Sequence, residues 1–115
     1  MRNRRIVVKD VVDLSPQLTS HGIGEKLVLL ANNETSSAIT QIAMTKLHEG
    51  DKVDQHAHAT MDEHFLFLEG EGFININDRK VICKPGLFIL VPASYHHDLH
   101  AVTEMKFLTI GVSIE

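Results

Sequence analysis

The chain has 115 residues, of which 43% are hydrophobic and 23% are charged, the balance of one ordinary globular domain. Its net charge is −4 with histidine counted as neutral, and charges of both signs are mixed along the sequence. This pattern argues against nucleic acid or an anionic membrane as the main partner. The one basic cluster, Arg2, Arg4 and Arg5, is typical of a solvated chain end. The longest apolar runs are far too short to span a bilayer.

Cysteine usage indicates a reducing compartment. The only cysteine is Cys83, so no disulfide can form within the chain. No N-terminal apolar stretch resembles a secretory signal. We therefore expect a cytoplasmic protein in which Cys83 is a small apolar residue on a strand rather than a reactive thiol.

In the first part of the chain, short apolar segments alternate with turn residues. Ile6–Val8 together with Val11–Val12 predicts a first strand or strand pair, and Leu27–Leu30 is a short apolar run. Residues 38–47 alternate in the manner of a strand. Residues 15–18 can form one short helical turn, because serine caps helices and proline suits the first helical position.

The rest of the chain predicts seven more extended segments separated by turns. Asn77 and Asp78 favour a tight hairpin turn, because both residue types tolerate positive φ. Leu87–Val91 is apolar at every position, so it is expected to be buried on both faces. Many short strands punctuated by Gly, Pro and Asn predict an all-β sandwich or barrel, and a jelly roll is one such fold. The expected segments are 53–58, 63–68, 73–76, 79–83, 87–91, 97–101 and 105–110.

Histidine is concentrated in the second half, where six of the eight histidines lie between His56 and His100. Residues i and i+2 of a strand point to the same face, so His56 and His58 can reach one ion. Glu63 would share an inward face with phenylalanines, and a carboxylate buried there needs a positive partner such as a metal. His97 follows a turn and lies on a late strand that can return beside the other three.

The spacing of these residues resembles the two motifs of the cupin family. The first motif is Gly, five residues, His-x-His, three or four residues, Glu, six residues and Gly. The second is Gly, five residues, Pro-x-Gly, two residues, His, three residues and Asn. Ser94 and Ala101 stand where the second motif has its second Gly and its Asn. The remaining positions match at Gly50, His56, His58, Glu63 and Gly70 in the first motif, and at Gly86, Pro92 and His97 in the second.

The resemblance implies an all-β double-stranded β-helix, or jelly-roll barrel, as a single cupin domain over 1–115. Its N-terminal strands would lie in 1–47, its metal-binding core in about 48–103 and its final strand in 104–115. It also implies that one divalent ion is held inside the barrel by His56, His58, Glu63 and His97. Three imidazoles and one carboxylate suit Mn, Fe, Ni, Cu or Zn better than Mg or Ca. Such a site leaves one or two coordination positions for water or substrate oxygens.

Other polar residues near the motifs receive separate predictions. His96 and His100 have the opposite strand parity to His97 and are expected to face away from the metal. Asp62 is an alternative to Glu63, but only Glu63 keeps six residues before the motif glycine. Tyr95 either lines the barrel mouth or packs. The remaining histidines are expected on the outer face or surface: His21, His48 and His64.

Three functions follow from the resemblance, because the fold alone does not fix an activity. The first is a metal-dependent enzyme, dioxygenase-like, that acts on a small oxygenated or anionic substrate. The second is an isomerase or epimerase of a sugar or keto acid, which needs a base. No inward lysine or second carboxylate is evident as that base. The third is a non-catalytic module that binds a small ligand or the metal itself.

A homodimer is also predicted. Leu66 and Leu68 point away from the metal face, and with Leu87–Val91 they form an apolar surface that needs cover. The resemblance implies pairing through packed sheets or exchanged N-terminal strands, for which 6–12 is the candidate. The competing interpretation is that this segment folds back over its own sheet.

Overall fold

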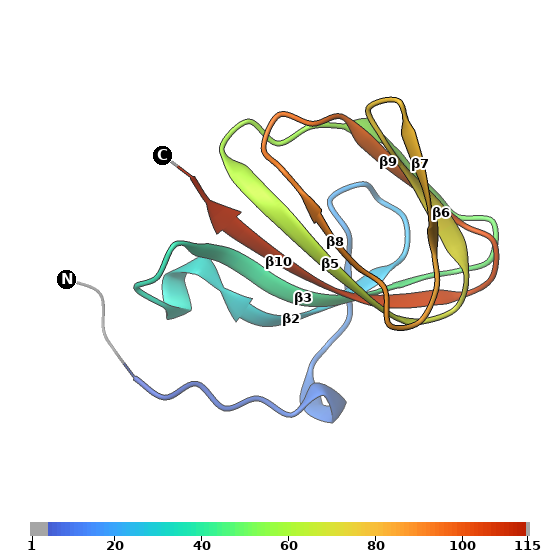
Figure 1. The fold of residues 1–115 in the computed structure, drawn as a ribbon. Coiled ribbons are helices and arrows are strands. Elements are labelled where there is room, and N and C mark those ends of the chain that lie inside the picture. Colours follow the sequence, from blue (N-terminus) through green and yellow to red (C-terminus); the bar gives the residue numbers. More distant parts are fainter. Residues whose placement is uncertain (1–4, 115) are drawn as a thin grey trace.

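Ten strands and two short 3-10 helices make up the regular structure of residues 5–114, which are the residues that the computed structural model describes (Figure 1). Arg2 and Arg4 of the predicted basic chain end lie outside these described residues. No helix within 5–114 has the length and apolar character needed to cross a membrane. The elements are η1 (Val11–Asp13), β1 (Gln17–Leu18), β2 (Glu25–Ala31), η2 (Asn32–Glu34), β3 (Ile39–Leu47), β4 (Lys52–His56), β5 (Met61–Glu69), β6 (Gly72–Ile76), β7 (Arg79–Cys83), β8 (Phe88–Val91), β9 (His97–Ala101) and β10 (Met105–Ser113).

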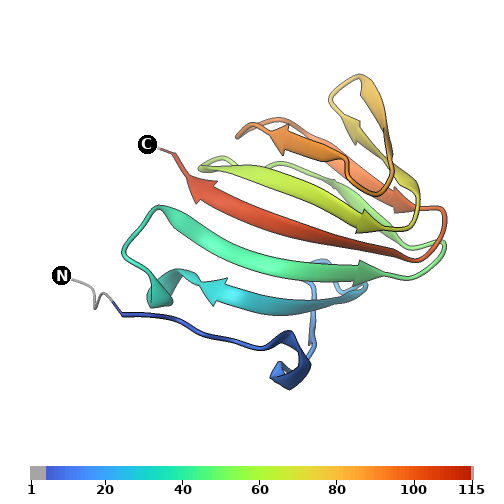
Figure 2. The ribbon, with the colours of Figure 1, turned by 60° about the horizontal axis from the view of Figure 1, so that its bottom comes forward.

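Two antiparallel sheets form the barrel, which confirms the predicted all-β architecture (Figures 1 and 2). The larger sheet has the order β1-β2-β3-β10-β5-β8, and the smaller has the order β4-β9-β6-β7. The last strand, β10, therefore lies in the middle of the larger sheet, between β3 and β5. β4 pairs with β9 in the smaller sheet and β5 pairs with β8 in the larger sheet, so the two motifs meet in both sheets.

The core lies between the inner faces of the two sheets. Phe65, Phe67 and Phe107 form an aromatic group whose ring centroids are 5.5–5.9 Å apart. Phe67 is fully buried, and burial of one such side chain contributes about 1.5–3 kcal/mol to folding. Leu47 and Ile74 are also fully buried. The predicted alternation of β5 is confirmed, since the buried phenylalanines alternate with partly exposed neighbours.

Two positions with left-handed backbone shape the strand ends, and the first confirms the predicted hairpin turn. The hairpin of β6 and β7 turns at Asn77, whose φ of 51° is the left-handed conformation that asparagine tolerates. Gly70, the last position of the first motif, has a φ of 83°. A Cβ at Gly70 would collide with the carbonyl oxygen of Glu104, so both backbone conformation and close packing require glycine there.

Two predictions about the N-terminal region are wrong. Residues 5–10 are not a paired strand, and 11–13 form η1, where the Asp10 carboxylate accepts from the backbone N–H of Val12. Both views place 5–10 alongside β2 (Figures 1 and 2), and Lys9 pairs with Glu34 at 2.6 Å. The helical turn predicted at 15–18 is instead β1, because Gln17 and Leu18 pair with β2. Tertiary pairing overrides the local capping signal there.

The expectation that Leu87–Val91 is buried on both faces is also wrong. Phe88 is 57% exposed and Leu90 is 44% exposed, whereas Val91 is buried. Phe88 and Leu90 share the outer face of β8, which no other layer of the described chain covers.

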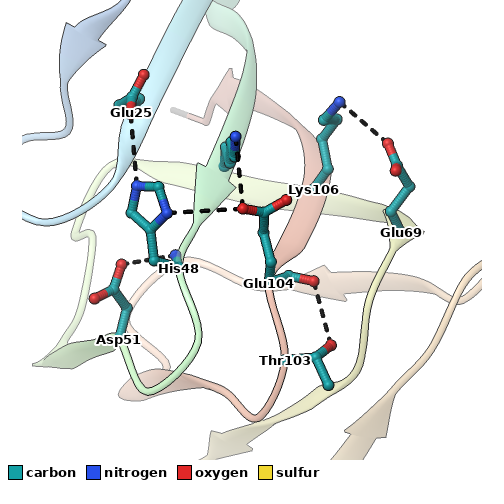
Figure 3. Close-up of polar contacts among 8 residues, drawn as sticks. Glu25, His48, Asp51, Glu69, Thr103, Glu104 and Lys106 are labelled. Atoms are coloured by element: carbon teal, nitrogen blue, oxygen red, sulfur yellow. Dashed lines mark hydrogen bonds and ion pairs between the residues drawn. The ribbon is translucent and has the colours of Figure 1, made fainter.

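Charged side chains gather where β2, β3, β5 and β10 meet at one end of the larger sheet (Figure 3). His48 lies at the surface, as expected, with its ring nitrogens 3.5 Å from Glu25 and 3.8 Å from Glu104. Lys106 pairs with Glu69 at 3.1 Å on the adjacent strands. These groups are largely exposed, so each pair contributes little to stability.

Candidate metal centre

The four sequence-predicted ligands come from three strands and one connection. His56 ends β4, and the register pairs it directly with His97 on β9 of the same sheet. Glu63 lies on β5 in the opposite sheet. His58 follows β4, and its carbonyl accepts a 2.7 Å hydrogen bond from the N–H of Ser94. The first and second motifs therefore hold each other in place at the site.

All four predicted side chains converge, with one ligand atom from each lying within 4.8 Å of the others. Glu63 Oε1 is 3.3 Å from His97 Nε2 and 3.6 Å from His58 Nε2. The ring centroids of His56 and His97 are 4.2 Å apart. His97 is 3% exposed, whereas the side chain of His58 is 32% exposed, so the cluster lies at the edge of the core with one side open.

Backbone carbonyls orient two of the imidazoles. His56 Nδ1 is 2.8 Å from the carbonyl oxygen of Asp54, and His97 Nδ1 is 3.1 Å from that of Tyr95. In the tautomer that donates from Nδ1, the Nε2 lone pair of each ring is free for a ligand bond. Such partners fix the rotation of ligating histidines in metal sites.

The electrostatics of the cluster keep Glu63 ionised. Burial alone would raise the pKa of Glu63, but the imidazoles of His58 and His97 outweigh this effect and lower it to about 2. The same carboxylate raises the pKa of His58, whereas burial lowers the pKa of His56. At neutral pH the site therefore presents one carboxylate among three imidazoles.

The residues present fit a divalent transition metal. His97 Nε2 is buried and makes no hydrogen bond among the described residues, although Glu63 Oε1 lies 3.3 Å away, because in the tautomer that donates from Nδ1 both facing atoms are acceptors. An unpaired buried polar atom is destabilising, and a metal ion would satisfy it. Three nitrogen donors and one carboxylate oxygen are the donor set of Mn, Fe, Ni, Cu or Zn rather than of Mg or Ca.

A cavity of about 110 Å³ opens beside the cluster. One water occupies about 30 Å³ in the liquid, so the space suits a small molecule of a few heavy atoms. Part of its wall is apolar and comes from the barrel core, namely Leu47, Val53, Phe65, Leu99 and Phe107. His56, Glu63 and His97 also line this cavity, so a ligand bound in it would reach the cluster.

Two titratable residues of the cavity wall were not predicted from the sequence. His21 is exposed, as expected, but it is not remote from the site, because its ring centroid is 4.4 Å from that of His56. The loop between β1 and β2 carries His21 to the site. This loop packs closely against β3, since a Cβ added at Gly24 would lie only 2.6 Å from the carbonyl oxygen of Lys46. Lys26 on β2 lines the cavity, which corrects the expectation that no inward lysine is present. Both residues lie outside the motifs, and no spacing signal identifies them.

The remaining candidates lie outside the cluster. Asp62 accepts a 2.8 Å hydrogen bond from the N–H of Ala93, so it braces a turn and does not replace Glu63. His100 faces outward, where its ring stacks on Phe73 with centroids 4.4 Å apart. His96 is exposed, and the side chain of Tyr95 is absent from the cavity wall.

His64 follows its predicted parity. Its Nδ1 contacts the carbonyl oxygen of Ile110 at 2.9 Å. Its ring lies 6.1 Å from that of Phe88 on the edge strand, whose side chain is exposed. It therefore takes no part in the cluster.

The two departures from the second motif have different consequences. Ser94 has a φ of 71°, so the position where the motif has glycine is left-handed here as well. Ala101 is buried and exchanges backbone hydrogen bonds with the turn at Gly50 and Asp51, both at 2.9 Å. The asparagine of the motif is therefore not needed to join β9 to this turn.

The comparisons with known proteins agree with this architecture. The family model described as the cupin domain matches residues 43–111, more than half of the chain. A predicted oxalate decarboxylase from Thermotoga maritima is 24% identical, with a TM-score of 0.86 over 93% of this chain and 99% of that chain. Ectoine synthase from P. lautus is 17% identical, with a TM-score of 0.82 over 93% and 78%. KdgF from Halomonas is 12% identical, with a TM-score of 0.77 over 98% and 96%.

At these identities the structural likeness shows the fold alone. No curated protein matches the chain by sequence. The family match covers both motifs and the four clustered side chains, and the barrel topology accords with it. The chain therefore belongs to the cupin family.

Proposed function

We propose that His56, His58, Glu63 and His97 hold one divalent transition metal ion, and that the protein is a metal-dependent enzyme for a small anionic or oxygenated substrate. The observation that carries this proposal is the buried Nε2 of His97, which lacks a hydrogen-bond partner in 5–114 while it lies among three other possible ligands. A site built only for stability would not keep such an atom unpaired.

The metal would supply Lewis-acid chemistry, or oxygen chemistry if it is redox-active. The chain's own residues support either use. Glu63 offsets one positive charge and keeps its carboxylate ionised at neutral pH. The carbonyls of Asp54 and Tyr95 hold two imidazoles in fixed rotations. The apolar part of the cavity wall would pack against the carbon skeleton of a substrate. We favour a dioxygenase-like reaction.

A second candidate, isomerisation of a sugar or keto acid, gains support from Lys26. The sequence offered no base for removal of an α-proton, but Lys26 lines the same cavity as the cluster. A lysine in its neutral form can serve as a general base. Both candidates therefore use the same cavity and differ in whether oxygen is consumed.

One experiment separates these reactions. The protein loaded with Fe²⁺ is mixed with a panel of small 2-oxo and 2-hydroxy acids, while an electrode records oxygen and proton NMR in D₂O records exchange at the α-carbon. The proposal expects oxygen uptake with at least one acid, and His58→Ala should abolish it. Exchange without oxygen uptake would favour isomerisation. If neither occurred in the metal-loaded protein, the enzymatic proposal would fail and a binding module would remain.

A further inference from the structure

We infer that the cavity beside the cluster takes a small dianion, one end of which lies at the metal ligands while the other binds Lys26 and Gln41. This inference rests on the proposed function and adds the substrate class. It starts from the polar residues of the cavity wall that lie outside both motifs. Those on β2, β3 and β10 are Lys26, Gln41, Thr45 and Thr109, and the loop before β2 adds Thr19, Ser20 and His21.

The strand register places this lysine on the inner face. Lys26 pairs with Thr45 of β3, and Thr45 is 7% exposed and lines the cavity. Lys26 Nζ donates a 3.2 Å hydrogen bond to Gln41 Oε1. This bond orients the Gln41 amide, whose N–H groups make no hydrogen bond within residues 5–114 and remain as donors for a ligand. An ammonium and an amide N–H side by side form a site for a carboxylate.

Among the described residues, no carboxylate pairs with Lys26. Within residues 5–114 Lys26 makes no ion pair, whereas Lys9, Lys46 and Lys106 each pair with a glutamate. Glu63 is the carboxylate on this cavity wall, and it contacts His58 and His97 instead. A partly buried cation that has only a neutral hydrogen-bond partner favours an anionic ligand.

The charge balance of the loaded site indicates a dianion. Ligating imidazoles are neutral, so a divalent ion and Lys26 outweigh the single carboxylate of Glu63 by two positive charges. A ligand with one anionic group at each end would neutralise both. The cavity volume of about 110 Å³ limits the carbon skeleton to a few atoms, which would pack against Phe65 and Leu99.

The test compares dicarboxylates with their monoamides on protein loaded with Mn²⁺. Malonate, succinate and glutarate each differ from the corresponding monoamide by one charge at nearly constant size. Isothermal titration calorimetry measures each Kd in the parent and in Lys26→Met. Lys52→Met is the matched control, because Lys52 is an exposed lysine on β4 that does not line this cavity.

In the parent, at least one dicarboxylate should bind roughly tenfold to a hundredfold more tightly than its monoamide, the range expected for a charge-assisted hydrogen bond. Lys26→Met should remove this preference while Lys52→Met keeps it. Lys26→Arg should also keep it, because arginine retains the charge but cannot act as a base. Lys26→Gln repeats the test with a polar neutral side chain should the methionine variant not fold.

Three results would overturn the inference: a preference in Lys26→Met equal to that of the parent, no preference in the parent, or loss of Mn²⁺ binding in Lys26→Met. The last would mean that Lys26 acts on the metal ligands rather than on the anion. A parent that takes up no Mn²⁺ or other transition metal would instead refute the proposed function. Metal titration before each calorimetric run therefore distinguishes the two failures.

Discussion

Removal of one imidazole from the cluster should weaken metal binding by two to three orders of magnitude. Four-ligand zinc sites bind with about 10–16 kcal/mol, so one ligand of four accounts for about 2.5–4 kcal/mol. That loss corresponds to roughly a hundredfold to a thousandfold in Kd. His97→Ala also opens a cavity, since His97 is 3% exposed. His58→Ala is therefore the companion variant, because its side chain is 32% exposed and the fold should tolerate its loss.

The assay is competition for Zn²⁺ between the protein and a chromophoric chelator, with thermal melts to confirm that each variant is folded. His100→Ala is the control, because His100 is a histidine on the same strand as His97 whose ring stacks on Phe73 at the outer face. Its Kd for zinc should equal that of the parent. Equal zinc affinity in folded His58→Ala, folded His97→Ala and the parent would refute the assignment of these ligands.

Four further outcomes are expected. Metal affinity should fall as pH drops from about 8 to about 5. The loss should start above pH 6.5, because the pKa of His58 is raised and its proton must leave before a metal binds. A metal affinity that stays flat over this pH range would contradict this. The protein should sediment as a homodimer, because Ile6 and Val8 are 89% and 85% exposed and such apolar side chains need a covering partner. Val8→Asp should give the 12.9 kDa monomer, and a parent mass of 12.9 kDa would rule the dimer out. Cys83 should resist thiol reagents until the protein is unfolded, because burial raises its pKa to about 11, and rapid labelling of the folded protein would disprove it. Ser94→Gly should raise the free energy of unfolding in urea by about 1 kcal/mol, because φ is 71° there, and an unchanged value would show that the serine is not strained.

Local periodicity and motif spacing were sufficient to predict the cluster. Glu63 begins the run that alternates with buried phenylalanines, a relation that depends on strand geometry and that one sequence reveals. His56 ends β4 and His58 lies two residues later in the connection, so the motif spacing rather than strand parity identified the pair. The pairing of His56 with His97 is a long-range contact, and the sequence indicated it only because the second motif marks the late strand.

Contacts that depend on tertiary pairing were not predictable. His21 reaches the cluster because its loop packs against β3, and Lys26 faces inward because of its register with that strand. Ile6–Val8 is a β-branched run typical of a strand, but residues 5–10 run alongside β2 without a strand pairing to it. Leu87–Val91 is apolar throughout, yet Phe88 lies on an outer face that no other layer of the described chain covers. Apolar composition therefore predicted where strands occur better than which faces are covered.

The central claim is that the four clustered side chains hold one transition metal ion per chain, and metal counting tests it most directly. The protein is purified without added metal, its metals are quantified by inductively coupled plasma mass spectrometry, and the measurement is repeated after chelation and after dialysis against Mn²⁺, Fe²⁺, Ni²⁺, Cu²⁺ or Zn²⁺. We predict that at least one of these ions returns to one equivalent per chain in the parent and fails to do so in His58→Ala. A parent that retains none of the five, or that retains them equally without His58, would contradict the account.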